Sequence, residues 1–104
     1  MTRQNIIEQI RQVLKCVTPN AQTILYGSQA RGDARADSDI DLLILLDEPE
    51  ITPRREQDII RPLYELEVKS GIIISPMIMP RRLWENRPFQ TPFSLNILND
   101  GVAL

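Results

Sequence analysis

Residues 26–42 have the sequence YGSQARGDARADSDIDL, and this stretch decides the fold. A short β-prone run from Thr23 to Tyr26 leads into it, and Gly27 ends that run before four residues that can open a helix. At its other end begins the run from Ile40 to Leu46, which is apolar at every position except Asp41 and is bounded by acids. Such a run is typical of a strand covered on both faces in the middle of an α/β sheet. The stretch therefore predicts a strand, a short helix and a second strand in succession.

The turn at Gly27 has the chemistry of a phosphate cradle. Glycine lets a phosphate approach the backbone closely, and the start of a helix offers free N–H groups and a partial positive charge. Ser28 adds a hydroxyl donor, although its position suits an N-cap equally well. Arg31 either reaches the ligand or pins the following loop through Asp33 or Asp39.

Asp39 and Asp41 form the second half of the pattern. Residues i and i+2 of a strand point to the same face, so the two carboxylates make half of an oxygen-ligand site. Mg²⁺ is usually bound by one or two carboxylates together with substrate phosphates. The bland alternative is a solvated strand start, but two acids before a buried strand are costly without a partner or a metal. We therefore predict a nucleotide site with Mg²⁺ or Mn²⁺.

Composition excludes several other chemistries. The chain has 104 residues, 12 Lys and Arg, 14 Asp and Glu, one Cys and no His. Without histidine there is no imidazole base, no Ser-His-Asp triad and no His-ligated zinc. A net charge of −2 argues against a protein that coats nucleic acid. No apolar run approaches the roughly 20 residues that cross a bilayer, so we expect one cytoplasmic domain over residues 1–104.

Helical periodicity marks the N-terminal segment. Apolar residues over 2–17 follow i, i+3, i+4, i+7 spacing, which predicts an amphipathic helix capped by Thr2 or Asn5. Cys16 lies among apolar positions of this helix, and we expect it to be buried.

The second half continues the alternation of helix and strand. Residues 54–69 predict a long helix, in which Pro62 marks a kink or a late first turn. Residues 72–79 predict a strand, and the proline inside it, Pro76, suggests a bulge or an edge position.

The C-terminal part carries weaker patterns. We expect a short helical stretch at Trp84, and an irregular segment over 86–104 with a short helix through Leu98. The aromatic side chains of Trp84, Phe89 and Phe93 are expected to pack in the core or against this segment. The coarse order predicts an alternating α/β domain of two or three layers.

Three pieces of sequence, Gly27-Ser28, Arg31-Gly32 and Ser38-Asp39-Ile40-Asp41-Leu42, together resemble the signature of the nucleotidyltransferase superfamily related to DNA polymerase β. The short length resembles the minimal nucleotidyltransferases of prokaryotes. The resemblance implies an α/β (α+β) nucleotidyltransferase fold, a small mixed β-sheet flanked by helices. It implies that Asp39 and Asp41 are catalytic residues and metal ligands, and that the nucleotide-binding residues are Gly27, Ser28, Arg31 and Ser38.

The implied reaction is attack of an acceptor oxygen on the α-phosphate of a nucleoside triphosphate, with release of pyrophosphate. Ser28 would contact the β- and γ-phosphates. We expect ATP or another nucleoside triphosphate as substrate, and AMP as the group transferred.

The chain departs from the superfamily at one position. Active members usually carry a third carboxylate on a later strand, here Gly71 to Met79, where Ser75 is the polar residue at a plausible position. Serine is neither a strong Mg²⁺ ligand nor a general base near neutral pH. The substitutes that the sequence offers are Asp33, Asp37, Glu65 and Glu67.

Two hypotheses follow from this departure. In the first, the chain is an enzyme whose base and acceptor come from another chain or from a second copy, because so short a chain lacks an acceptor-binding domain. The resemblance implies a toxin–antitoxin pair, with a helical toxin of the HEPN class as the partner. In the second, the chain is a weakened nucleotidyltransferase-fold binding module that acts as antitoxin by contact. Transfer to a small molecule such as an aminoglycoside is a third, weaker hypothesis.

Overall fold

Four strands form one sheet in the order β3, β2, β1 and β4. The computed structural model describes residues 2–104. Its strands are β1 (Gln22–Tyr26), β2 (Ile40–Leu46), β3 (Ile74–Pro80) and β4 (Val102–Ala103), and its helices are α1 (Arg3–Val17), α2 (Ser28–Arg31), α3 (Pro53–Ser70), α4 (Arg81–Glu85) and α5 (Pro92–Asp100). The sheet is mixed, because β2 pairs antiparallel with β1 and parallel with β3. The predicted mixed sheet flanked by helices is confirmed.

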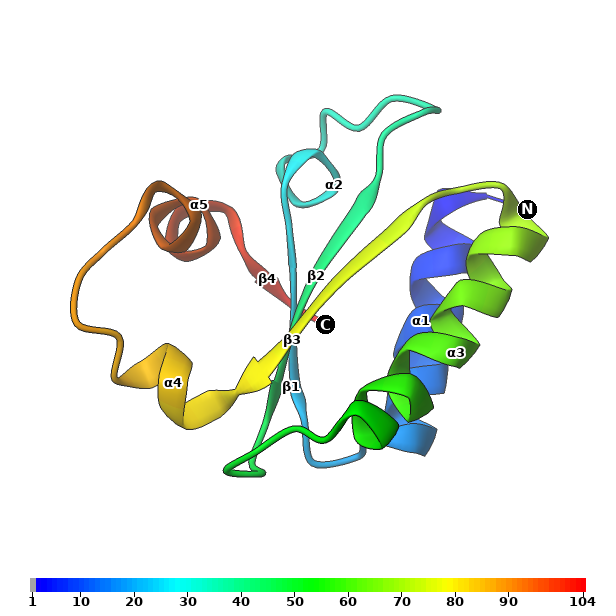
Figure 1. Ribbon diagram of the computed structural model, residues 1–104. Coiled ribbons are helices and arrows are strands. Elements are labelled where there is room, and N and C mark those ends of the chain that lie inside the picture. Colours follow the sequence, from blue (N-terminus) through cyan, green and yellow to red (C-terminus); the bar gives the residue numbers. More distant parts are fainter. Residues whose placement is uncertain (1) are drawn as a thin grey trace.

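Helices cover both faces of the sheet. Figure 1 shows α1 and α3 side by side against one face, and α4 and α5 on the other. The parallel pairing of β2 with β3 requires a crossover, and α3 supplies it. The short helix α2 lies at one end of the sheet, beside the loop that leads into β2 (Figure 1).

Strand β2 is the centre of the core, as its run of apolar residues predicts. Leu42 and Ile44 belong to the larger cluster, together with Ile6 and Ile10 of α1. Their neighbours on β2 point to the opposite face, where a smaller cluster contains Leu43, Leu45 and Ile97, with Tyr26, Trp84 and Phe93 packed against it. The alternation of β2 therefore serves two cores.

Side-chain caps and glycine fix the ends of the long helices. Thr2 caps α1 by accepting a hydrogen bond from the backbone N–H of Asn5, which confirms one of the two expected caps. Thr52 caps α3, and Gly71 ends it in the left-handed conformation. Pro62 lies inside α3 rather than in its first turn.

Strand β3 lies at the edge of the sheet, as Pro76 predicts. The strand was predicted over 72–79. It begins two residues later, at Ile74, and ends one residue later, at Pro80. Its first residue donates its backbone N–H to the Glu67 carboxylate at 2.8 Å, an interaction that joins α3 to the strand start.

Three expectations for side chains and for the C-terminal segment need correction. Cys16 is exposed, because it faces away from the buried stripe of α1. Trp84 and Phe93 pack in the core as expected, but Phe89 is 68% exposed. In the segment 86–104, the predicted short helix through Leu98 is confirmed as α5, which begins with a capping box, whereas the terminal strand β4 was not predicted.

Within residues 2–104, no helix is both long and apolar enough to cross a membrane.

Shortening one buried side chain of the central strand β2 tests the role of this strand in the core. Ile44 is fully buried, so Ile44→Ala removes contacts that the surrounding side chains cannot replace. We expect the free energy of unfolding in urea to fall by about 2–5 kcal/mol. Ile73→Ala, at a side chain that is 54% exposed, is the matched control and should lose much less. Equal losses in the two variants would contradict the assigned core.

Candidate functional site

The turn between β1 and α2 requires a glycine at position 27. Gly27 has φ 76° and ψ −156°, a conformation that is essentially restricted to glycine. A Cβ atom there would lie 2.5 Å from Oδ2 of Asp41. The backbone of the turn and the Asp41 carboxylate therefore come together at a distance that no other residue permits.

Ser28 is the first residue of α2, and the N-cap of this helix is Gly27. The N-cap role that the sequence allowed for Ser28 is therefore wrong. Its carbonyl accepts a hydrogen bond from the N–H of Asp33, which closes the end of α2. In the sequence, Ser28 directly follows Gly27.

The register of the sheet brings three polar side chains together. Asp41 pairs with Tyr26 of β1 on one side and with Ser75 of β3 on the other. Asp39 lies just before β2, and its Oδ2 accepts a hydrogen bond from the Ser75 hydroxyl at 3.3 Å. Because residues alternate along β2, Asp41 lies on the face of the sheet that carries Leu43, opposite to α1 and α3.

The electrostatics of the pair favour a cation. Burial raises the pKa of Asp41, and the charge of Asp39 raises it further, against the opposing effect of Arg31. The pKa of the Tyr26 hydroxyl is raised as well, first by burial and then by the charge of Asp41. A bound divalent cation would relieve this repulsion. The carboxylates of Asp39 and Asp41 offer only oxygen ligands, and this set fits Mg²⁺ or Mn²⁺ with phosphate oxygens completing the shell.

Arg31, the last residue of α2, forms ion pairs with one acid in the loop that follows and with one at the end of α5. It contacts the carboxylates of Asp33 at 3.3 Å and of Asp100 at 3.6 Å. Of the two alternatives drawn from the sequence, these contacts agree with the one in which Arg31 pins the loop. The Ser38 hydroxyl also serves the loop, because it accepts a hydrogen bond from the backbone N–H of Arg35.

In the described part of the chain, residues 2–104, no further acid joins Asp39 and Asp41 as a third metal ligand. Within residues 2–104, no group of three or more His, Cys, Asp or Glu side chains is placed to hold a metal ion. Glu67, one of the candidate substitutes, accepts the hydrogen bond from the N–H of Ile74. The position in register with Asp41 on β3 belongs to Ser75.

The sequence pattern missed one residue that contacts this region. Arg3 donates hydrogen bonds to the side chain of Gln29 and to the carbonyl of Ser38. One signal was available in the sequence. Arg3 is a basic residue in the first turn of a helix, where its charge opposes the helix dipole, and this indicates that other groups stabilise it.

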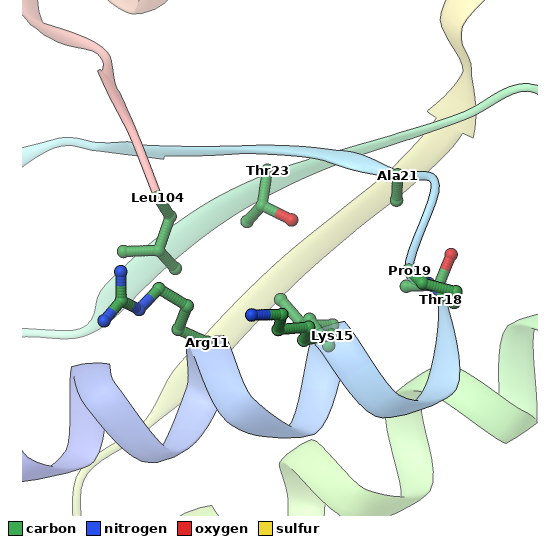
Figure 2. Close-up of a pocket in the computed structure, with 8 residues that line it drawn as sticks. Arg11, Lys15, Thr18, Pro19, Ala21, Thr23 and Leu104 are labelled. Atoms are coloured by element: carbon green, nitrogen blue, oxygen red, sulfur yellow. The ribbon is translucent and has the colours of Figure 1, made fainter.

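A cleft of about 260 Å³ lies elsewhere, between α1 and the β1–β4 side of the sheet. Figure 2 shows Arg11 and Lys15 of α1 on one side of it, with Thr23 and Leu104 on the other. Neither Asp39 nor Asp41 lines this cleft. We therefore place the candidate site at the acid pair.

Comparison with known proteins identifies a family model and a relative in sequence that match this chain. Residues 6–95 match the model of the nucleotidyltransferase domain family. The chain is 36% identical over 83 residues to a predicted protein adenylyltransferase of Methanocaldococcus jannaschii, which covers 80% of this chain and 77% of that protein.

Two solved structures share the fold. A predicted minimal nucleotidyltransferase has a TM-score of 0.61 and 25% identity, over 100% of this chain and 97% of its own. A crystal structure of a toxin-antitoxin with AMP-PNP has a TM-score of 0.64 and 16% identity, over 98% of this chain and 72% of its own. At that identity, the second likeness concerns the fold alone.

Gly27→Ala tests the close approach between the turn and the acid. Gly71 also has a positive φ, but a Cβ there meets nothing within 4 Å, so Gly71→Ala is the matched control. We expect Gly71→Ala to lower the free energy of unfolding by about 1–2 kcal/mol, because of its backbone conformation. Gly27→Ala should lose about 1–3 kcal/mol more, because its backbone conformation is essentially restricted to glycine and because Asp41 must move. Urea unfolding measures both, and equal losses would contradict the close approach.

The raised pKa of Asp41 predicts a pH-dependent stability. The folded chain binds this proton more tightly than the unfolded chain, so the stabilisation is present at low pH and is lost as pH rises through the folded pKa. We expect Asp41→Asn to raise the free energy of unfolding at pH 7 without divalent ions. The gain should vanish below the ordinary pKa of an aspartate.

Urea titrations across this pH range measure the effect. Asp37→Asn, at an exposed loop acid, should stay within about 0.5 kcal/mol of the parent chain. An Asp41→Asn chain less stable than the parent at pH 7 would refute the assigned repulsion.

Proposed function

Because this chain belongs to the nucleotidyltransferase domain family, we propose that it transfers AMP from ATP to a hydroxyl group on a protein. The family membership rests on the match over residues 6–95 and on the 36% identity to the Methanocaldococcus jannaschii protein. The observation that carries the proposal is the placement of Asp39 and Asp41 beside the Gly27 turn, where a Cβ atom would collide with Asp41. Protein as the acceptor class is suggested by the name of that relative, a predicted protein adenylyltransferase.

In this proposal, Asp39 and Asp41 hold Mg²⁺ or Mn²⁺, and the nucleotide lies against Gly27, Ser28, Arg31 and Ser38. The ion, when bound, would neutralise charge on the α-phosphate and on the departing pyrophosphate. We assign to the Ser28 hydroxyl, one residue past the turn, the role of donor to a phosphate oxygen. Arg31 adds positive charge beside Asp41, as its effect on the Asp41 pKa indicates.

The reaction balances without a redox partner. The acceptor oxygen forms a bond to the α-phosphorus, and the bond from that phosphorus to the pyrophosphate oxygen breaks. The acceptor hydroxyl loses its proton to a base. Ser75 occupies the position in register with Asp41 and is not a base near neutral pH, so we assign the base to the acceptor protein or to solvent. A helical toxin of the HEPN class is the acceptor to test first.

The same serine favours a second candidate function. Of the acids within residues 2–104, only the pair Asp39 and Asp41 is available for a metal at this site. A chain with two carboxylates can bind its partner and neutralise it by contact, without efficient transfer. The two candidates predict different outcomes when the acid pair is removed.

The deciding experiment incubates the chain with α-labelled ATP and Mg²⁺, with and without the protein encoded by the adjacent gene. If the chain is an enzyme, label passes to the partner, and Asp39→Asn with Asp41→Asn lowers the rate by a factor of about 100 or more. Asp58→Asn, at an exposed acid on α3, is the matched control and should retain the parent rate.

Partner binding is measured in the same samples by isothermal titration calorimetry. No transfer, together with tight partner binding that survives the double substitution, would support the binding module and reject the enzyme.

A further inference from the structure

Arg3 makes three hydrogen bonds far along the chain from its own position. Its Nε donates to Oε1 of Gln29 at 2.8 Å, its Nη2 to the carbonyl of Ser38 at 2.6 Å, and its Nη1 to the carbonyl of Ala36 at 3.4 Å. The guanidinium group is planar and presents its N–H donors in a fixed fork. One side chain thus joins two groups of acceptors in a defined relative position.

These acceptors belong to the two halves of the candidate site. Gln29 lies on α2, one residue after Ser28 and two after the Gly27 turn. The Ser38 carbonyl is part of the peptide unit that joins Ser38 to Asp39. Because that unit is planar, a hydrogen bond to its oxygen restricts the position of the Asp39 Cα atom. Arg3 therefore connects the α2 side of the site with the acid side.

Within residues 2–104, the segment 34–38 makes no long-range hydrogen bond or ion pair other than those with Arg3. The ion pair of Arg31 reaches Asp33, before this segment, and the Ser75 hydrogen bond reaches Asp39, after it. Asp33, Arg35, Ala36 and Asp37 are exposed. Two short-range hydrogen bonds close a turn, from the Ser38 N–H to the Arg35 carbonyl and from the Arg35 N–H to the Ser38 hydroxyl. Such a turn fixes its own shape but not its place relative to the sheet.

Helix α1 provides a firm base for the connection. Its buried face includes Ile6, Ile7 and Ile10, which pack against the sheet. Arg3 is the first residue of this helix, one turn before that face. In Figure 1, the N-terminal end of α1 lies at the same end of the sheet as α2 and the loop into β2.

We infer that Arg3 is a positioning residue, which holds the loop of residues 34–38, and through it Asp39, in place beside α2. The consequence for metal and nucleotide binding rests on the proposed function; the restraint on the loop does not. Lysine cannot replace the arginine fully, because a single ammonium group cannot span the Gln29 and Ser38 acceptors as the fork does.

Hydrogen–deuterium exchange of the ligand-free chain tests the restraint itself. In Arg3→Ala, the amides of Arg35 and Ser38 should exchange about tenfold faster than in the parent chain, while those of 42–46 in β2 keep their rates. Arg11→Ala is the matched control, because Arg11 lies on the same helix and makes an exposed ion pair with Glu8. Unchanged exchange at Arg35 and Ser38 in Arg3→Ala would overturn the inference.

Binding of Mn²⁺ with a non-hydrolysable ATP analogue, followed by electron paramagnetic resonance, tests the consequence. We expect Mn²⁺ to bind 10–100-fold more weakly to Arg3→Ala, with Arg3→Lys between it and the parent chain and Arg11→Ala equal to the parent. In the transfer assay, Arg3→Ala should lower kcat. In a separate thermal unfolding experiment, its melting temperature should stay close to that of Arg11→Ala.

The two proposals fail in different ways. If the parent chain binds no Mn²⁺ with the analogue, the proposed function fails, and the exchange rates alone decide the role of Arg3. If the parent chain binds Mn²⁺ and Arg3→Ala binds it within twofold of the parent, the positioning role is rejected and the proposed function stands.

Discussion

The close approach between the Gly27 backbone and the Asp41 carboxylate is the constraint on which the rest of the site depends. It exists because β1 and β2 pair in the register that sets Tyr26 opposite Asp41. A slip of one residue would turn Asp41 toward the larger core, among isoleucine and leucine side chains, and bring Leu42 to the polar face. Register, turn and acid pair are therefore one unit, and burial of β2 on both faces holds it together.

Much of this fold follows from local patterns. The apolar run from Ile40 to Leu46 predicted β2 residue for residue, and helical spacing predicted α1 and α3, because a buried face repeats with the period of its own element. Strand β4 has only two residues and no pattern of its own; it exists through pairing with Ile24 and Leu25, nearly eighty residues away in the sequence. Cys16 was misplaced because its apolar neighbours in sequence lie on another side of the helix.

In the candidate site too, the features that depend on local pattern could be predicted from the sequence, and those that depend on long-range contacts could not. Asp39 and Asp41 were predicted to share a face because strand alternation is a property of the strand alone, and Ser75 was identified as the residue in place of an acid. The contacts of Arg3 with Gln29 and Ser38 join two helices and the loop before β2, and no local spacing in the sequence indicates them. The sequence left two alternatives for Arg31, contact with the ligand or an ion pair that pins the loop. The ion pair with Asp100, at the end of α5, depends on the tertiary fold and could not be predicted from local spacing.

The edge strand β3 determines how the chain can meet another protein. The Ile73 carbonyl accepts from Ile40, so Ile74, Pro76 and Ile78 direct their backbone groups away from the sheet. Of their donors, the Ile74 N–H is taken by Glu67, and a proline has none. An incoming strand would find too few partners here to extend the sheet, which protects the chain from edge-to-edge aggregation. A protein that binds on this side meets backbone carbonyls but few backbone donors, so most of its specific contacts must come from side chains.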